Sequence, residues 1–342
     1  MPLINRFSAI PFFACLASGT VWAEKVKPPT IILGEPTTNI VVAEYKEAGP
    51  YNRIVFSKVR VLKSRDDVPA LIDIAKPDLR KPLVAGQSYV IAYTPYAEDR
   101  FERIGVNPRG ANFISSPGLE PALFADTPDN EALLMWRIDE DEDGEAEEEG
   151  ERDSPAAEAA MPKLLQMLAS TDSQRRAFAA AEIAYRAKLV AALDAAQQKA
   201  LQRFVIDDAG PDGSRALILA AAAAMPAKSV AVRGWNDLAV DLLENSALTD
   251  STEAGRSRLI IAALSYPPTL ERARDGKLHG RWLRSDNIAL VEAAANMLQQ
   301  RSVDVARSAV AEALAESSLP PETRTYLVAF DQRLAVMREK TL

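Results

Sequence analysis

The clearest group of metal-ligating side chains in the sequence is an acidic run at residues 139–151. Asp139, Asp141 and Asp143 stand at alternate positions and Gly144 follows them, which is the pattern that opens a calcium-binding loop. The closing half of such a loop is missing, because its twelfth position is Gly150 instead of a bidentate Glu. The sequence therefore predicts no resident cofactor, and only weak Ca²⁺ binding by these three carboxylates.

A second candidate is the basic stretch between Arg272 and Arg284, which includes Trp282. Clustered cations beside an aromatic ring could bind an anionic group. Acidic residues within and beside the stretch dilute its charge, and this mixture favours a solvated loop. His279, the only histidine of the chain, lies in the same stretch. Because no serine or cysteine motif accompanies it, we expect no catalytic role for His279.

One His and one Cys exclude most catalytic centres that depend on these side chains. Cys- or His-rich metal sites, CxxC redox centres and most Ser or Cys hydrolase triads need more of them. The sequence also has no GxSxG, HExxH or Walker pattern. A hydrolase that uses two carboxylates leaves no such signature, so this class stays open. With 40 basic and 48 acidic residues, the chain has a net charge of −8, and we expect no nucleic-acid partner.

The first 23 residues have the pattern of a secretory signal peptide. Arg6 precedes an apolar run, and Val21 and Ala23 occupy the −3 and −1 positions of a cleavage site. The apolar run is too short to span a membrane, and the phenylalanines before Cys15 do not suit lipidation there. We expect cleavage after Ala23 and a periplasmic or secreted mature chain with no transmembrane segment.

Residues 24–138 contain short runs of branched and aromatic residues between Pro, Gly, Asn and Asp, which predict β-strands. The predicted strands are Asn39–Tyr45, Arg53–Leu62, Ala70–Ala75, Ser88–Thr94 and Ala132–Ile138. Several short strands in so few residues fit a small antiparallel barrel or sandwich. The stretches NIVVAEYKEAGPYNRIVFSKVRVLK and LVAGQSYVIAY resemble the OB-like barrels of the netrin and tissue-inhibitor-of-metalloproteinase families. The disulfides of those families are absent, so the resemblance implies the fold without inhibitor function.

The acidic run at residues 139–151 also separates two parts of different composition. Ten of its 13 residues are acidic and none is basic. Like charges repel one another and offer no apolar surface to bury, so we expect a disordered linker here.

Residues 152–342 are rich in Ala, Leu, Arg, Glu and Gln, and their apolar residues recur at intervals of three and four, which predicts helices throughout. The predicted helices are residues 156–169, 172–185, 194–206, 214–225, 236–245, 253–265, 285–300, 303–316 and 322–338. Loops with Pro or Gly separate most of them.

Two of these segments repeat. SRALILAAAAAMP at Ser214–Pro226 aligns with SRLIIAALSYPP at Ser257–Pro268, at an offset of 43 residues. Weaker copies place the same Arg at positions 176 and 307. Spacings near 40 residues are typical of paired-helix units, and the region resembles HEAT-like repeats. The resemblance implies an α-helical solenoid, and an irregular helical bundle is the alternative.

Four residues of this region are candidates for contact with a partner. Trp235 and Trp282 lie 47 residues apart in RGWND and GRWLR, and Arg281 and Arg284 flank the second of them. Tryptophan and arginine are favoured anchors of protein interfaces. The alternative is that both tryptophans fill the seam between repeats and that the repeated Arg caps or bridges neighbouring helices.

The sequence thus predicts a multidomain α+β protein. Its parts are a signal peptide (1–23), an OB-like antiparallel β-barrel or sandwich (24–138), an acidic linker (139–151) and a HEAT-like helical solenoid (152–342). A solenoid presents a long surface to partners. We therefore expect a non-enzymatic scaffolding protein that binds a protein partner in the cell envelope. The alternative is a carboxylate-dependent envelope hydrolase, for example on glycan, in which the β domain recognises the substrate.

Overall fold

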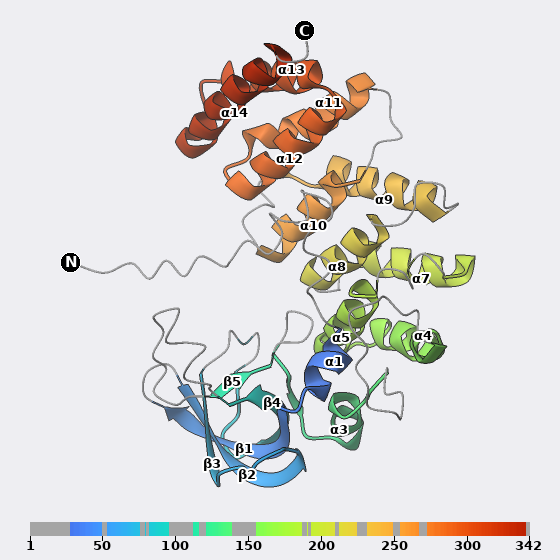
Figure 1. Ribbon diagram of the computed structural model, residues 1–342, viewed down its shortest axis with the longest axis vertical. Coiled ribbons are helices and arrows are strands. Elements are labelled where there is room, and N and C mark those ends of the chain that lie inside the picture. Colours follow the sequence, from blue (N-terminus) through green and yellow to red (C-terminus); the bar gives the residue numbers. More distant parts are fainter. Residues whose placement is uncertain are drawn as a thin grey trace, which may run out of the picture. The chain divides into compact units, whose positions relative to one another are not determined.

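The protein is a mixed α+β chain that is mostly helical, as its computed structural model shows (Figure 1). The structure describes residues 28–49, 53–75, 79, 82–95, 112–115, 121–138, 155–186, 190, 193–208, 212–223, 231–248, 254–266 and 272–339. The chain forms two compact units, which divide between Ile183 and Ala184. The predicted signal peptide and the predicted linker, residues 1–23 and 139–151, lie outside the described residues and stay predictions.

The first unit contains a six-stranded sheet. Its strands are β1 (Asn39–Gly49), β2 (Arg53–Lys63), β3 (Leu71–Ala75), β4 (Ser88–Thr94), β5 (Asn112–Ile114) and β6 (Leu123–Ala125). The strand order is β1-β2-β3-β5-β4-β6, with an additional pairing between β1 and β4. All pairings are antiparallel except β3 with β5, which is parallel. The first four predicted strands are confirmed within a few residues.

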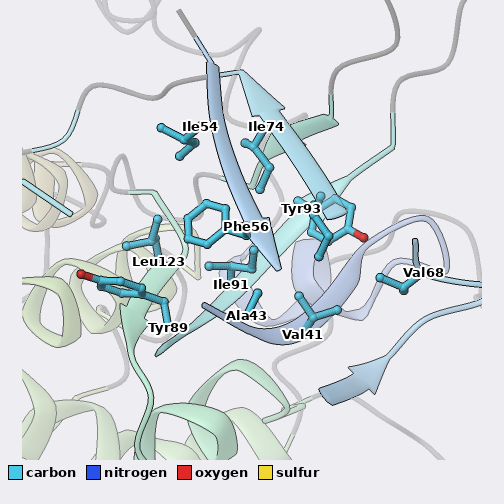
Figure 2. Close-up of a cluster of buried hydrophobic side chains, with 11 residues drawn as sticks. Val41, Ala43, Ile54, Phe56, Val68, Ile74, Tyr89, Ile91, Tyr93 and Leu123 are labelled. Atoms are coloured by element: carbon cyan, nitrogen blue, oxygen red, sulfur yellow. The ribbon is translucent and has the colours of Figure 1, made fainter. Parts of the chain in front are cut away.

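Alternating side chains of the strands form two apolar clusters, one on each face of the sheet. The first cluster, with Phe56 at its centre, is drawn in Figure 2, and β4 contributes Tyr89, Ile91 and Tyr93 to it. The residues between them, Val90 and Ala92, belong to the second cluster. Because β4 is buried on both faces, its sequence is almost continuously apolar.

Three helices cover the second face of the sheet. They are α1 (Pro29–Gly34), α3 (Pro128–Leu134) and α5 (Ser173–Ala184), which contribute Leu33, Leu134 and Phe178 to the second cluster. A further helix, α4 (Pro155–Leu168), places Met167 against the same cluster. The helices α4 and α5, which the sequence assigned to the C-terminal part, therefore lie in the unit with the sheet.

The predicted strand Ala132–Ile138 is wrong, because α3 occupies its first half. Thr127 has extended backbone before the helix, and its hydroxyl accepts a hydrogen bond from the Asn130 backbone N–H at 3.3 Å. Pro128 then fills the first helical position, where a missing N–H costs nothing. The apolar run that follows these helix-start signals suits a strand equally well when it is considered alone, and this is why the prediction failed.

The second unit is entirely helical in its described residues. Its elements are α7 (Ala195–Ile206), α8 (Asp212–Ala223), α9 (Ala231–Asn245), α10 (Ala254–Leu264), α11 (Arg272–Gly280), the 3₁₀ helix η4 (Arg281–Arg284), α12 (Ile288–Arg301), α13 (Val303–Leu314) and α14 (Pro321–Glu339). Seven of them match predicted helices. The predicted loop at residues 272–284 is wrong, because α11 and η4 form there.

The helices of this unit pack in an alternating order. Successive contacts join α8 to α10, α10 to α12 and α12 to α14, while α7 contacts α9 and α11 contacts α13. Small residues allow the closest of these approaches: a Cβ on Gly255 of α10 would lie 3.1 Å from the Cβ of Asp212 and 3.4 Å from the backbone N of Gly213 in α8. A larger side chain at Gly255 would push the two helices apart.

Candidate functional site

An open pocket of about 480 Å³ lies in the first unit, between α3, α4 and α5. Its wall combines apolar and charged side chains: Asp129, Ala132, Leu133, Lys163, Gln166, Met167, Ser170 and Arg175. Pockets that bind small molecules are commonly of this size and have an apolar lining with a few polar groups. Sequence patterns did not indicate this site, because its wall comes from three separate segments.

Two cations line the pocket. The Lys163 ammonium lies 3.8 Å from the centre of the Trp136 ring, and this is its one contact with the described residues. Arg175 is fixed by Asn130, whose side-chain oxygen accepts from Nε at 3.1 Å and from Nη2 at 2.9 Å. The Asp129 carboxylate lies 3.6 Å from Nη2 of Arg175 and is 80% exposed. The wall therefore carries one negative and two positive groups.

A pair of carboxyl groups lies near the start of α3. Burial and a side-chain hydrogen bond with Glu131 raise the pKa of Asp126 above its usual range. Glu131 in turn accepts a hydrogen bond from Nη2 of Arg60 at 2.7 Å. Asp126 is exposed, so the pair lies on the surface of the protein.

Trp235 and Trp282, the predicted partner anchors, are both fully buried in the second unit. Nε1 of Trp235 donates to the side-chain oxygen of Gln198 at 2.8 Å, which ties α9 to α7. Nε1 of Trp282 has no hydrogen-bond partner among the described residues. Neither ring presents a surface to a partner in this conformation.

Arg281 and Arg284 also make contacts within the second unit. Arg281 donates to the backbone oxygen of Ser246, close to the end of α9, and lies 5.0 Å from the centre of the Trp282 ring. Arg284 pairs with Glu312, at 3.1 Å, and with Glu316. These contacts link η4 to the end of α9 and to the C-terminal part of α13.

The repeated Arg has different surroundings at different positions. Arg215 of α8 is 1% exposed and donates from Nε to the backbone oxygen of Val205 at 2.7 Å, so it bridges to the end of α7. It also pairs with Asp212 at 2.7 Å. Arg307 lies in α13 and pairs with Asp331 of α14 at 3.3 Å. Arg176 lies in α5, in the other unit. Arg176, Arg215 and Arg307 are therefore not equivalent in the structure.

His279 belongs to a buried polar cluster between α10, α11 and α12. Its Nε2 lies 3.3 Å from the backbone oxygen of Leu264, and its Nδ1 lies 3.3 Å from Nη1 of Arg301. A neutral ring with the proton on Nε2 satisfies both contacts. Burial lowers the pKa of His279 to about 4 and that of Arg301 to about 10. Tyr266 closes the cluster, because its backbone oxygen lies 3.4 Å from Nη2 of Arg301 and its hydroxyl donates to Leu219 at 2.7 Å. The ring of His279 is 3% exposed and cannot reach a substrate.

Asp139, Asp141 and Asp143 lie outside the described residues, so the weak calcium site stays a prediction. Among the residues that the structure does describe, no group of three or more His, Cys, Asp and Glu side chains could hold a metal ion. Within the same ranges, no helix is long and apolar enough to cross a membrane. Comparison with known proteins identified no matching protein family, curated protein or solved structure.

Proposed function

We propose that this chain is an exported, non-enzymatic scaffolding protein that binds a protein partner of the cell envelope through its helical unit. The observation that carries the proposal is that helices two apart in the chain contact one another, α8 to α10 to α12 to α14, as do α7 with α9 and α11 with α13. Two rows of helices with contacts between neighbours are typical of a HEAT-like solenoid, whose long surface is suited to binding.

The proposal also interprets the sheet as an OB-like barrel. The strand pairings form a closed ring, which runs from β1 through β2, β3, β5 and β4 and back to β1. Within this ring, β3 pairs with β5 in parallel. A closed order of five strands leaves few free edges, which is how small β domains avoid unwanted strand pairing.

The outer face of α14 is our proposed contact surface. Val328 and Val336 are 44% and 52% exposed, and Gln332 lies between them at intervals of four residues. Residues four apart share one face of a helix. The opposite face, with Leu327, Phe330 and Leu334, is buried in the unit. Exposed valines on one stripe offer an apolar anchor to a partner.

The test is to crosslink tagged residues 24–342 in their native envelope and identify what is captured. We expect one dominant protein partner, which the double variant Val328→Glu with Val336→Glu loses. The matched control is Ser308→Glu with Ala311→Glu, which adds the same charge to exposed positions of α13 and should retain the partner. A wild-type protein that returns alone and monomeric would overturn the proposal.

One observation favours the alternative, a carboxylate-dependent envelope hydrolase. Asp126 and Glu131 form a carboxyl pair in which the pKa of Asp126 is raised, as a general acid requires. Under this alternative, the purified protein would release reducing ends from peptidoglycan, and Asp126→Asn would abolish that release. Equal, background-level release from wild type and variant would remove the alternative.

A further inference from the structure

We propose that the pocket between α3, α4 and α5 binds a small organic monoanion, one carboxylate group with an apolar tail. This site lies in the unit with the sheet and is independent of the proposed partner surface on α14. A medium-chain fatty acid has the chemistry that the pocket fits, and octanoate is the simplest probe.

The charge of the pocket wall favours a single negative group. Lys163 and Arg175 supply two positive charges and Asp129 one negative charge, so a bound monoanion leaves the wall neutral. A dianion would place a second negative charge near the Asp129 carboxylate, which lies 3.6 Å from Arg175. Such a like-charge contact is unfavourable.

The pocket also has hydrogen-bond donors that the fold does not use. Nη1 of Arg175 and the side-chain amide of Gln166 make no hydrogen bond with a described residue, although the other two Arg175 nitrogens are fixed by Asn130. The Lys163 ammonium contacts the face of the Trp136 ring, which offers its N–H groups no oxygen or nitrogen acceptor. A guanidinium held in place on one side and free on the other is well suited to a carboxylate, because little of its freedom is lost on binding.

Apart from Ser170, the remaining wall is apolar and suits a hydrocarbon tail. Leu133 and Met167 belong to or pack against the second cluster of the sheet, so they present a fixed floor to the pocket. Ala132 lies at the edge and leaves room because its side chain is small. A volume of about 480 Å³ is sufficient for a chain of eight carbons but small for a folded peptide.

The experiment titrates residues 24–342 with octanoate and measures heat and Trp136 fluorescence. Because Lys163 lies 3.8 Å from the centre of the Trp136 ring, a carboxylate that binds this ammonium should change the emission of that tryptophan. We expect saturable binding, a fluorescence change that Trp136→Phe removes, and no competition by inorganic phosphate or octanol at the same concentration. Phosphate that competes as well as octanoate would overturn the proposal, as would octanol that competes equally.

Three variants locate the site. Lys163→Glu should weaken octanoate binding at least tenfold, since an attractive charge becomes repulsive. Ala132→Trp should weaken it by a similar factor, since the ring fills the pocket. Lys199→Glu is the control, because Lys199 is exposed on α7 in the other unit, and it should bind octanoate as wild type does. Unchanged binding by both pocket variants would show that octanoate binds elsewhere and would overturn the proposal. Arg175 is left intact, because its bonds to Asn130 join α5 to α3.

Discussion

The two units of the molecule are held together by contacts of very different sequence separation. In the unit with the sheet, Thr30 bonds to Glu182 over 152 residues and Arg137 bonds to Leu33 over 104 residues. In the helical unit, Arg215 reaches Val205 over 10 residues, and even the bond from Tyr266 to Leu219 spans 47 residues. The first unit is therefore held together by contacts between its two ends, whereas the second is held together by contacts between segments that are close in the sequence.

This difference predicts that the loss of a single contact affects the stability of the two units differently. A contact between distant segments stabilises every element between them, so its loss should weaken the whole first unit. Where the contacts join neighbouring helices, each helix depends mainly on its neighbours. The loss of one contact should then lower the unfolding free energy only locally, as in repeat proteins. The four predictions below test this comparison, from the largest expected effect to the smallest.

Trp282→Ala should destabilise the helical unit by about 3–5 kcal/mol, because it removes a fully buried aromatic ring. Hydrogen exchange read by mass spectrometry checks where the loss falls. We expect lower protection in α11–α13 and unchanged protection in β1, β2 and β4. Equal loss in those strands would mean that the two units unfold as one, which contradicts the comparison.

Acid should destabilise the helical unit through His279. The pKa of His279 falls from an ordinary 6.5 to about 4 on folding, so the unfolded chain binds the proton more tightly. Stability from the neutral ring is complete above pH 6.5, and about 3 kcal/mol is lost as the pH falls to about 4. Protonation would also place a second cation beside Arg301.

Urea denaturation between pH 7 and pH 4 measures this loss. His279→Gln serves as the control, because its amide can still donate to Leu264 but does not titrate. The difference in unfolding free energy between wild type and this variant should change over the same pH interval. A constant difference would assign the acid sensitivity to other groups.

Glu182→Gln should destabilise the sheet unit by about 2 kcal/mol. The carboxylate accepts from the Thr30 backbone N–H at 2.9 Å and from its hydroxyl at 2.8 Å, and the amide can accept only one of them. Limited proteolysis should then cut near α1 faster. Thr30→Val, which keeps the side-chain shape but loses the hydroxyl, should give a smaller effect of the same kind. If both variants are cut at the wild-type rate, the Thr30–Glu182 bonds do not stabilise the sheet unit.

Gly86→Ala should cost about 1 kcal/mol, because Gly86 has φ of +80° and an L side chain is strained there. A Cβ at this position meets nothing within 4 Å, so the backbone alone sets the cost. Thermal unfolding of the sheet unit measures the shift. Gly276→Ala, with ordinary φ and the nearest atom at 3.5 Å, should leave stability unchanged or slightly raised.

Local patterns were sufficient to predict the first four strands and most helices, but not α1, α3, α11, η4, β5 or β6. The apolar run after Pro128 suits either a strand or a helix, and the capping hydroxyl of Thr127 decides for the helix. The sequence of α11 contains two glycines and several charges, so its intrinsic helix propensity is low. Burial of Leu278 and His279 stabilises it in the fold, and no local pattern records that burial.

The candidate sites were harder to predict than the elements. Trp235 and Trp282 were chosen for residue type and for their 47-residue spacing, but burial of a ring depends on distant neighbours, such as Gln198, which lies 37 residues from Trp235. The pocket of the first unit was missed because it combines Ala132, Lys163 and Arg175 from three helices. A set of residues that only tertiary packing brings together has no spacing to detect.

The bond between Thr30 and Glu182 also sets the order of events while the chain is made. It joins the start of α1 to the end of α5 across 152 residues, so this bond cannot form until the ribosome has added all of them. At typical rates of synthesis this delay is on the order of ten seconds. Throughout that interval the bond between α1 and α5 is missing, and the sheet unit is incomplete.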